Sequence, residues 1–170
     1  MTEGRLRLII TRHAKSAWDD PALEDHDRPL NARGLKQACE LGDWLASRGY
    51  EPEEVFCSSA KRTRETWAGI ESAVLHTRPD VHILPKLYNA DPVVLLQKLQ
   101  SAQMPVVMMI GHNPGIADFA SMLLQQPPNT AEFKKYPTAA TTVIDFFEDS
   151  WATTGPGKGQ LLEFFKPFEE

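Results

Sequence analysis

Cysteine is scarce in this chain, with only Cys39 and Cys57 among 170 residues. The sequence holds no C-x-x-C pair and no cluster of histidine and cysteine at metal-ligand spacing. A disulfide framework and a structural zinc site are therefore not expected, and a reduced, cytoplasmic setting fits best. We expect no metal and no cofactor.

An excess of charge of one sign and a long apolar run are also missing. The 18 basic and 23 acidic residues leave a net charge of -5, which gives no global attraction to nucleic acid or to an anionic membrane. The first apolar run covers only residues 8–10, which is too short for a signal peptide or a membrane span. We expect a soluble single domain over residues 1–170, in which any anion binds at a local site.

Short apolar runs alternate with helical patterns along the chain. Residues 6–11 form a short run rich in β-branched residues, and residues 106–110 form another with methionine at its centre. Both are continuous rather than alternating, which is typical of strands buried on both faces. Shorter patterns predict strands at 55–57, 81–84, 141–147 and 160–165, and helices at 61–75, 92–101 and 115–124. This alternation predicts a three-layer α/β/α sandwich with a mostly parallel central sheet, in which ligands bind beyond the carboxyl ends of the strands.

The helix after the first strand has clear boundary signals. Asn31 can cap its start, and Arg48 followed by Gly49 is typical of its end. Its apolar positions repeat at helical spacing, which predicts a buried face made of Leu35, Ala38, Leu41 and Leu45. By contrast, residues 125–137 hold three prolines and are predicted to form a loop.

Basic side chains follow three of the predicted strands. Arg12 and His13 come directly after the first strand, and His112 comes directly after the strand at 106–110. Residues 57–62 (CSSAKR) leave a strand and enter a helix, where free backbone N–H groups and the helix dipole favour an anion. We expect these three strand ends to meet at the ligand-binding edge of the sheet.

Two arginines and two histidines at one edge indicate a pocket for a doubly charged tetrahedral anion, because guanidinium groups hold phosphate oxygens in bidentate fashion. A neutral imidazole attacks phosphorus when its other nitrogen is held by a hydrogen bond, and His13 is the candidate nucleophile. His112 can donate to the equatorial oxygens of the phosphoryl group. Arg62 and Arg64 differ by about 200° around their helix, and we place Arg62 in the pocket.

The nucleophile sets an expectation for pH. Imidazole attacks only when it is unprotonated, so activity should fall on the acid side as His13 becomes charged. A rate that stays flat down to about pH 5 would count against His13.

An ordered set of strings resembles a known family. Residues 11–18 (TRHAKSAW) resemble the Arg-His-Gly signature of the histidine phosphatase superfamily, which also contains the phosphoglycerate mutases. Further strings follow in the family's order at residues 27–34, 58–66, 87–90, 110–115 and 137–140. Ala14 stands in place of the signature glycine, which is similar to the small branch around the phosphohistidine phosphatase SixA. The resemblance implies a phosphoglycerate mutase-like fold.

The resemblance also implies roles for particular residues. His13 would become transiently phosphorylated, with Arg12, Arg62 and His112 around the phosphoryl group. Ser16, on the same string as His13, is a further candidate for phosphate binding.

Larger members of the family carry a carboxylic acid that protonates the leaving oxygen, in a Leu-x-Glu string. Residues 87–89 correspond to that string here, and the position of the acid holds Asn89. An alkoxide leaving group needs a proton, whereas imidazole leaving from a phosphoramidate needs less help. Asp91 and Asp19 are the candidate acids if one exists.

Three functions stay open at this point. The first is a phosphatase that acts on phosphohistidine in a protein, and the second is a phosphatase or mutase of a small phosphorylated compound. The third is a phosphate-binding interaction module without turnover. Connections between the predicted strands are short and the longest irregular stretch is 125–141, so little chain is left for a lid, which favours a protein side chain as substrate.

Overall fold

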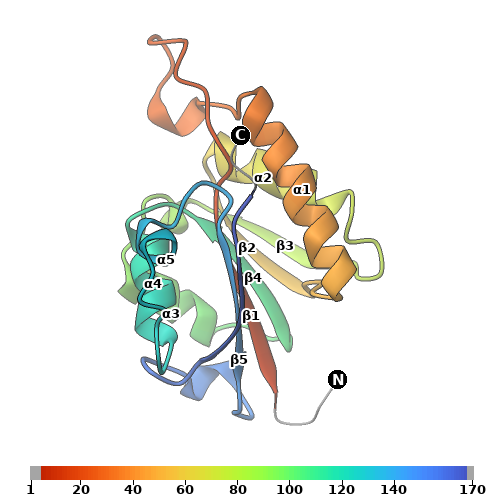
Figure 1. The fold of residues 1–170 in the computed structure, drawn as a ribbon, viewed down its shortest axis with the longest axis vertical. Coiled ribbons are helices and arrows are strands. Elements are labelled where there is room, and N and C mark those ends of the chain that lie inside the picture. Colours follow the sequence, from red (N-terminus) through yellow and green to blue (C-terminus); the bar gives the residue numbers. More distant parts are fainter. Residues whose placement is uncertain (1–4, 168–170) are drawn as a thin grey trace.

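A six-stranded sheet forms the centre of the computed structural model, which describes residues 5–167 (Figure 1). Its strands lie in the order β3-β2-β4-β1-β5-β6. Four pair in parallel: β1 (Leu6–Arg12), β2 (Glu54–Ser58), β3 (Asp80–Leu84) and β4 (Val106–Gly111). The antiparallel part consists of β5 (Thr141–Phe146), which pairs with β1, and β6 (Gln160–Phe165). The mostly parallel sheet is confirmed.

Helices cover both faces of this sheet (Figure 1). On one face α1 (Ala32–Arg48) packs against α2 (Lys61–Glu71). The other face carries α3 (Pro92–Gln100), α4 (Gly115–Leu123) and the short α5 (Ala131–Lys135). Single-turn 3-10 helices lie in three connections: η1 (Asp25–Asp27), η2 (Pro85–Leu87) and η3 (Trp151–Thr153). The predicted three-layer α/β/α sandwich is confirmed.

Side chains of β1 alternate between two apolar cores. Leu8 and Ile10 belong to the core beneath α3 and α4, and Ile9 belongs to the core beneath α1 and α2. All three are fully buried, and each such burial stabilises the fold by about 1.5–3 kcal/mol relative to exposure. Because helices cover both faces, three consecutive residues of this strand, 8–10, are apolar and buried, where a strand with one solvent face would alternate.

The boundaries of α1 agree with the prediction. The side chain of Asn31 accepts a hydrogen bond from the backbone N–H of Gly34 at 2.8 Å, and Gly49 ends the helix in the left-handed region with φ of 73°. Leu41 and Leu45 are buried, but Leu35 is 52% exposed, so its assignment to the buried face is wrong. The first turn of α1 buries Gly34, which directs Leu35 toward solvent.

Two further predictions are also wrong, one for the end of a helix and one for a loop. Helix α2 ends at Glu71, one turn before residue 75. Residues 125–137 contain α5, because the Thr130 hydroxyl accepts a hydrogen bond from the backbone N–H of Phe133 at 3.3 Å and the Phe133 side chain is buried. This N-terminal cap and the buried aromatic ring outweigh the neighbouring prolines.

Residues 13–31 form a long connection between β1 and α1, at the top of Figure 1. His26 in this connection lies 2.8 Å from the Ser59 hydroxyl, beyond the end of β2, and Arg28 donates to the carbonyl of Ala17 at 3.0 Å. The connection therefore folds back on itself and reaches the carboxyl end of β2. The expectation that residues 125–141 form the longest irregular stretch is wrong, because the connection 13–31 is longer and 125–141 contain a helix, Ala131–Lys135.

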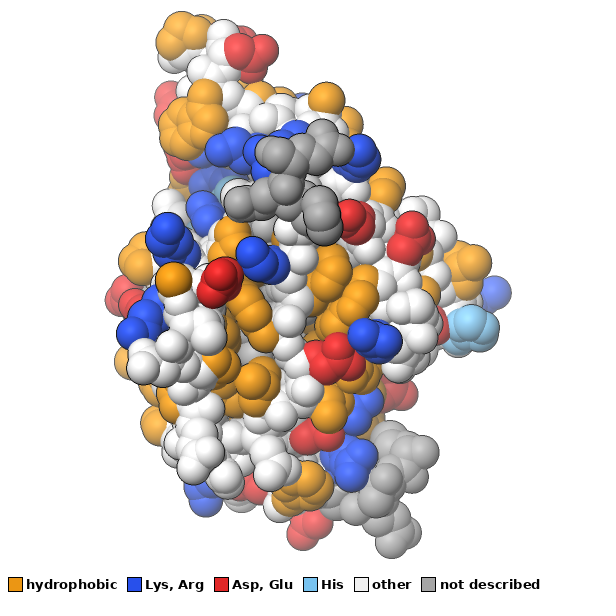
Figure 2. Space-filling model, in the orientation of Figure 1, with side chains coloured by type: hydrophobic (Ala, Val, Ile, Leu, Met, Phe, Trp, Pro, Cys, Tyr) orange, Lys and Arg blue, Asp and Glu red, His pale blue; other side chains and the backbone are white. Residues whose placement is uncertain are grey.

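The surface carries both signs of charge. Figure 2 shows acidic and basic side chains interspersed around apolar side chains in the middle of the face. Among the described residues 5–167, no helix has the length and apolar character needed to cross a membrane.

Gly34 lets α1 approach the loop that follows His13. A Cβ at this position would lie 2.0 Å from the carbonyl oxygen of Lys15. That oxygen is fixed because it also accepts the backbone N–H of Asn31 at 3.0 Å, and the N–H of Lys15 donates to Gln37 at 2.9 Å. The start of the helix and the loop thus position each other.

We predict that Gly34→Ala lowers the free energy of unfolding by about 1–3 kcal/mol, because the overpacking outweighs the better helix propensity of alanine. Urea denaturation measures this change. Gly155→Ala is the control, since a Cβ there meets nothing within 4 Å, and its effect should stay within about 0.5 kcal/mol. Equal stability of the two variants would contradict the close approach.

Candidate active site

The parallel pairing of β1 with β4 brings two histidines together. Arg12 lies opposite Gly111 at the carboxyl ends of these strands, and His13 and His112 are the next residue on each side. The backbone N–H of His13 donates to the carbonyl of Gly111 at 3.0 Å, which extends the pairing by one step. The centroids of the two imidazole rings lie 5.3 Å apart.

Two arginines complete the cluster of four predicted residues. Arg62, in the first turn of α2, directs Nε toward Nε2 of His13 at 3.4 Å. Arg12 donates through Nη1 to the carbonyl of Tyr136 at 3.1 Å, and burial and the nearby charge of Arg62 lower its pKa. Arg64 is exposed, in agreement with the choice of Arg62. Three strand ends thus supply one group of cationic and imidazole side chains.

The ring of His13 has a defined tautomer. Its Nδ1 lies 2.7 Å from the carbonyl oxygen of Ala14, and because a carbonyl only accepts, Nδ1 carries the proton. The lone pair is then on Nε2, the atom that faces Arg62. The backbone N–H of Ala14 donates to the hydroxyl of Thr66 at 3.0 Å, which ties this turn to α2. The local backbone therefore holds Nε2 in the form needed for nucleophilic attack.

His112 and Arg12 each have a buried nitrogen without a partner in the described chain. Nε2 of His112 lies 2.7 Å from the hydroxyl of Ser58, whereas its Nδ1 has no hydrogen-bond partner. The Nε of Arg12 is likewise buried and unpaired. A buried polar group without a partner costs about 1–3 kcal/mol, so both nitrogens favour a ligand with hydrogen-bonding oxygens.

The electrostatics of the cluster keep both imidazoles neutral. Burial, with the charges of Arg62, Arg12 and Arg28, lowers the pKa of His13 to about 3. Burial, with the neighbouring His13 and Arg62, also lowers the pKa of His112 to about 3. The predicted loss of activity on the acid side is therefore expected at lower pH than for a free imidazole, because burial and the nearby arginines lower the pKa of His13.

The three other predicted site residues differ in burial and in their contacts. Ser16 is buried, and its hydroxyl accepts a hydrogen bond from Nη1 of Arg28 at 3.0 Å. The two candidate acids, Asp19 and Asp91, are exposed, and within residues 5–167 neither forms a hydrogen bond or an ion pair with His13 or His112. The structure thus leaves both carboxylates outside the cluster.

The sequence analysis missed a group of residues beside the cluster. The carboxylate of Asp25 in η1 accepts hydrogen bonds from Arg62, Arg28 and Tyr88. The centroid of the Tyr88 ring lies 5.4 Å from that of the His112 ring and 4.9 Å from that of the His26 ring. The one signal was an acid three residues before Arg28, a spacing that a single 3-10 turn brings together.

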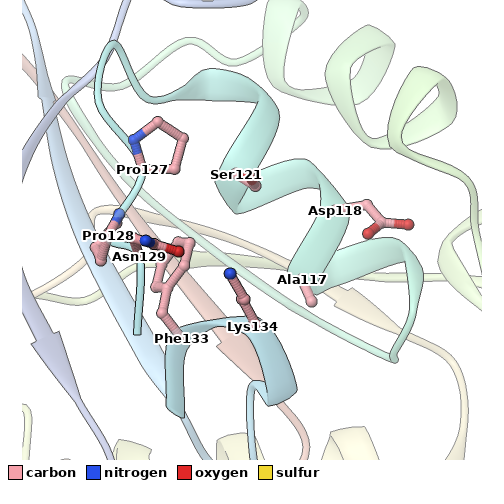
Figure 3. A pocket seen from close by; sticks show the side chains of 8 residues that line it. All are labelled: Ala117, Asp118, Ser121, Pro127, Pro128, Asn129, Phe133 and Lys134. Carbon is pink, nitrogen blue, oxygen red and sulfur yellow. The ribbon is translucent and has the colours of Figure 1, made fainter. Parts of the chain in front are cut away.

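A hollow in the surface lies apart from these residues. It is formed by α4, α5 and the connection between them, and has a volume of about 470 Å³ (Figure 3). Its lining residues are Ala117, Asp118, Ser121, Pro127, Pro128, Asn129, Phe133 and Lys134. It includes none of the clustered histidines and arginines, and the chemistry therefore points to the cluster as the candidate active site.

The fold and the cluster define an α/β protein suited to a tetrahedral anion. The model of the histidine phosphatase superfamily (branch 1) matches residues 8–91. An uncharacterized chloroplastic protein of Arabidopsis thaliana is 32% identical over 95% of this chain and 78% of its own length. The phosphohistidine phosphatase SixA of Escherichia coli is 28% identical over 64% of this chain and 68% of its own length.

A solved structure agrees over nearly the whole chain. It comes from Agrobacterium tumefaciens and is provisionally named phosphohistidine phosphatase SixA. Its sequence is 27% identical to this chain, and the two structures superpose with a TM-score of 0.78 over 95% of this chain and 98% of that chain. The chain belongs to the histidine phosphatase superfamily.

We predict that the free energy of unfolding decreases as pH falls below about 6.5. Histidines of the unfolded chain titrate near pH 6.5, whereas His13 and His112 stay neutral down to about pH 3 in the fold. The unfolded chain binds more protons in this window, so stability should fall by up to about 1.4 kcal/mol per pH unit for each histidine. Urea denaturation between about pH 7 and pH 5 measures the slope.

The control is a double variant, His13→Gln with His112→Gln, whose stability should depend less on pH. An unchanged slope in this variant would contradict the neutral state of the two rings.

Proposed function

We propose that the protein removes a phosphoryl group from phosphohistidine in a protein, through a phosphohistidine intermediate on Nε2 of His13. Phosphatase activity follows from membership of the superfamily. The single observation that supports His13 as the nucleophile is its tautomer: Nδ1 is bonded to the Ala14 carbonyl, and the lone pair of Nε2 faces the arginines.

The first chemical step transfers the phosphoryl group to the enzyme. The lone pair of Nε2 forms a bond to phosphorus while the bond from phosphorus to the substrate nitrogen breaks. The substrate imidazole carries a proton on its other nitrogen, so it leaves neutral with the electron pair of the broken bond. Nδ1 of His13 keeps its proton and its hydrogen bond to Ala14, which stabilises the imidazolium formed on phosphorylation.

Water completes the cycle. Its oxygen forms a bond to phosphorus, the bond from phosphorus to Nε2 breaks, and the electron pair returns to His13. Both protons of the water leave with the inorganic phosphate, and His13 regains its neutral form. Atoms and charge balance in both steps without a further reactant.

The phosphoryl group is proposed to be stabilised during its transfer by Arg12, Arg62 and His112. Phosphoryl transfer relies on positioning and on charge placed against the equatorial oxygens. Unpaired nitrogens on Arg12 and His112, together with the Nε of Arg62, supply hydrogen-bond donors around the reacting atom. His112 donates from Nδ1 if its Nε2 accepts from the Ser58 hydroxyl, a tautomer compatible with their 2.7 Å separation.

Two observations favour phosphohistidine over an ester of a small compound. The position of the family's acid holds Asn89, and Asp19 and Asp91 lie exposed outside the cluster, so an alkoxide would lack a nearby proton donor. His13 and His112 are each less than a tenth exposed, so the phosphoryl group has to project from its carrier to reach them. A long side chain such as phosphohistidine meets both requirements.

We predict that the wild type hydrolyses a phosphohistidine peptide at least about tenfold faster than an aryl phosphate ester, because imidazole leaves without a general acid. His13→Ala should abolish both activities, and His76→Ala, an exposed histidine, should retain them. Released phosphate measures the rates. Equal or faster ester hydrolysis would overturn the preference and favour the small-molecule phosphatase, with Asp91→Asn as its next test.

We also predict that vanadate competes with substrate, since it matches the phosphoryl group in shape and charge. Arg12→Ala should weaken its inhibition about tenfold or more, because a hydrogen bond to a charged group contributes about 1.5–3 kcal/mol. Arg64→Ala, which changes an exposed arginine of the same helix as Arg62, is the matched control. The measurement is the inhibition constant of vanadate for the wild type and the two variants. Equal constants for all three proteins would show that the anion binds away from Arg12.

A further inference from the structure

The carboxylate of Asp25 lies where three loops of the candidate site meet. Five hydrogen bonds from side chains end on this residue: two from Arg62, two from Arg28 and one from the hydroxyl of Tyr88. We propose that Asp25 is a positioning residue that holds Arg62 so that its Nε faces the nucleophilic nitrogen of His13. This inference rests on the proposed function, in which His13 is the nucleophile.

The geometry of Arg62 supports the proposal. Its Nη1 donates to the backbone carbonyl of Asp25 at 2.7 Å, and its Nη2 donates to the carboxylate at 3.0 Å. These two bonds fix the plane of the guanidinium group, because its five N–H donors form a rigid fork. The third nitrogen of the group, Nε, then lies 3.4 Å from Nε2 of His13. Asp25 therefore determines which nitrogen of Arg62 is presented to the reacting centre.

The same carboxylate anchors the loop that carries His13. Arg28 donates to one oxygen of Asp25 through Nε at 3.2 Å and Nη2 at 3.0 Å. Its third nitrogen, Nη1, donates at 3.0 Å both to the hydroxyl of Ser16 and to the carbonyl of Ala17, just beyond His13. Asp25 thus joins the nucleophile loop to α2 through two arginines that repel each other without it.

Tyr88 completes the arrangement from a third connection. Its hydroxyl donates to the carboxylate oxygen that also accepts Nη2 of Arg62, and its ring packs against His112. The hydrogen bond from Tyr88 is the largest cause that lowers the pKa of Asp25, followed by those from Arg28 and Arg62. Asp25 stays ionised at neutral pH and serves as a fixed anion, not as the proton donor that Asn89 fails to supply.

The test is the steady-state kinetics of Asp25→Asn on the phosphohistidine peptide. We expect kcat to fall about tenfold to a hundredfold, since a displacement of about 1 Å in a positioning group costs that much. KM should not rise, because Arg12 and Arg62 keep their charges. Asp27→Asn is the matched control: it removes the same charge from the same turn, and within residues 5–167 the carboxylate of Asp27 forms an ion-pair contact with His26 alone, at 3.7 Å.

A double-variant cycle separates positioning from a merely structural role. If Asp25 acts through Arg62, Arg62→Lys combined with Asp25→Asn should lose no more kcat than Arg62→Lys alone. Additive losses, or a kcat for Asp25→Asn within twofold of the wild type, would overturn the proposal. Should Asp25→Asn fail to fold by circular dichroism, Asp25→Glu keeps the charge and shifts the carboxylate by one methylene. A folded Asp25→Glu with wild-type kcat would then overturn it.

Failure of the proposed function has a different signature. It would appear as a wild type without phosphohistidine hydrolysis and without a labelled His13 phosphoenzyme. The position of Arg62 is then tested by vanadate binding alone, measured by calorimetry. Weaker binding by Asp25→Asn than by Asp27→Asn would support positioning, and equal binding would overturn it.

Discussion

The hydrogen-bonded pairing of β1 with β4 is the constraint on which the rest of the site depends. Two parallel strands in register end at Arg12 and Gly111, and each chain then turns away from the sheet. The first residue beyond each end is a histidine, and the N–H of His13 still bonds to the carbonyl of Gly111. A shift of one residue in this register would turn the neighbouring side chains to opposite faces and separate the two rings.

The charges around these histidines explain their chemistry. Arg12, Arg62 and Arg28 surround buried imidazoles in a region of little solvent, where an added proton is unfavourable. The same environment that keeps His13 neutral therefore favours an anion over a cation at this site. Asp25 balances part of this positive charge through its hydrogen bonds with Arg28 and Arg62.

The sequence predicted most of the fold because its signals are local. The apolar runs of β1 and β4, the Asn31 cap and the left-handed Gly49 each reveal an element from a few adjacent residues. The errors lie where distant contacts decide. Leu35 follows the apolar spacing of its helix, yet packing of Gly34 on Lys15 rotates it to the surface. Helix α5 was missed because the burial of Phe133 against distant strands outweighs the composition of its loop.

The candidate site divides in the same way. By itself the sequence determined which residues follow the strand ends, since His13, Arg62 and His112 are marked by their position after apolar runs and by the family's strings. Only the tertiary structure decided which nitrogen of His13 carries the lone pair, how far burial lowers its pKa, and that Asp25 and Tyr88 join the cluster. The reason is physical: tautomer, desolvation and ion pairing depend on atoms brought together from separate connections, and sequence spacing does not encode their distances.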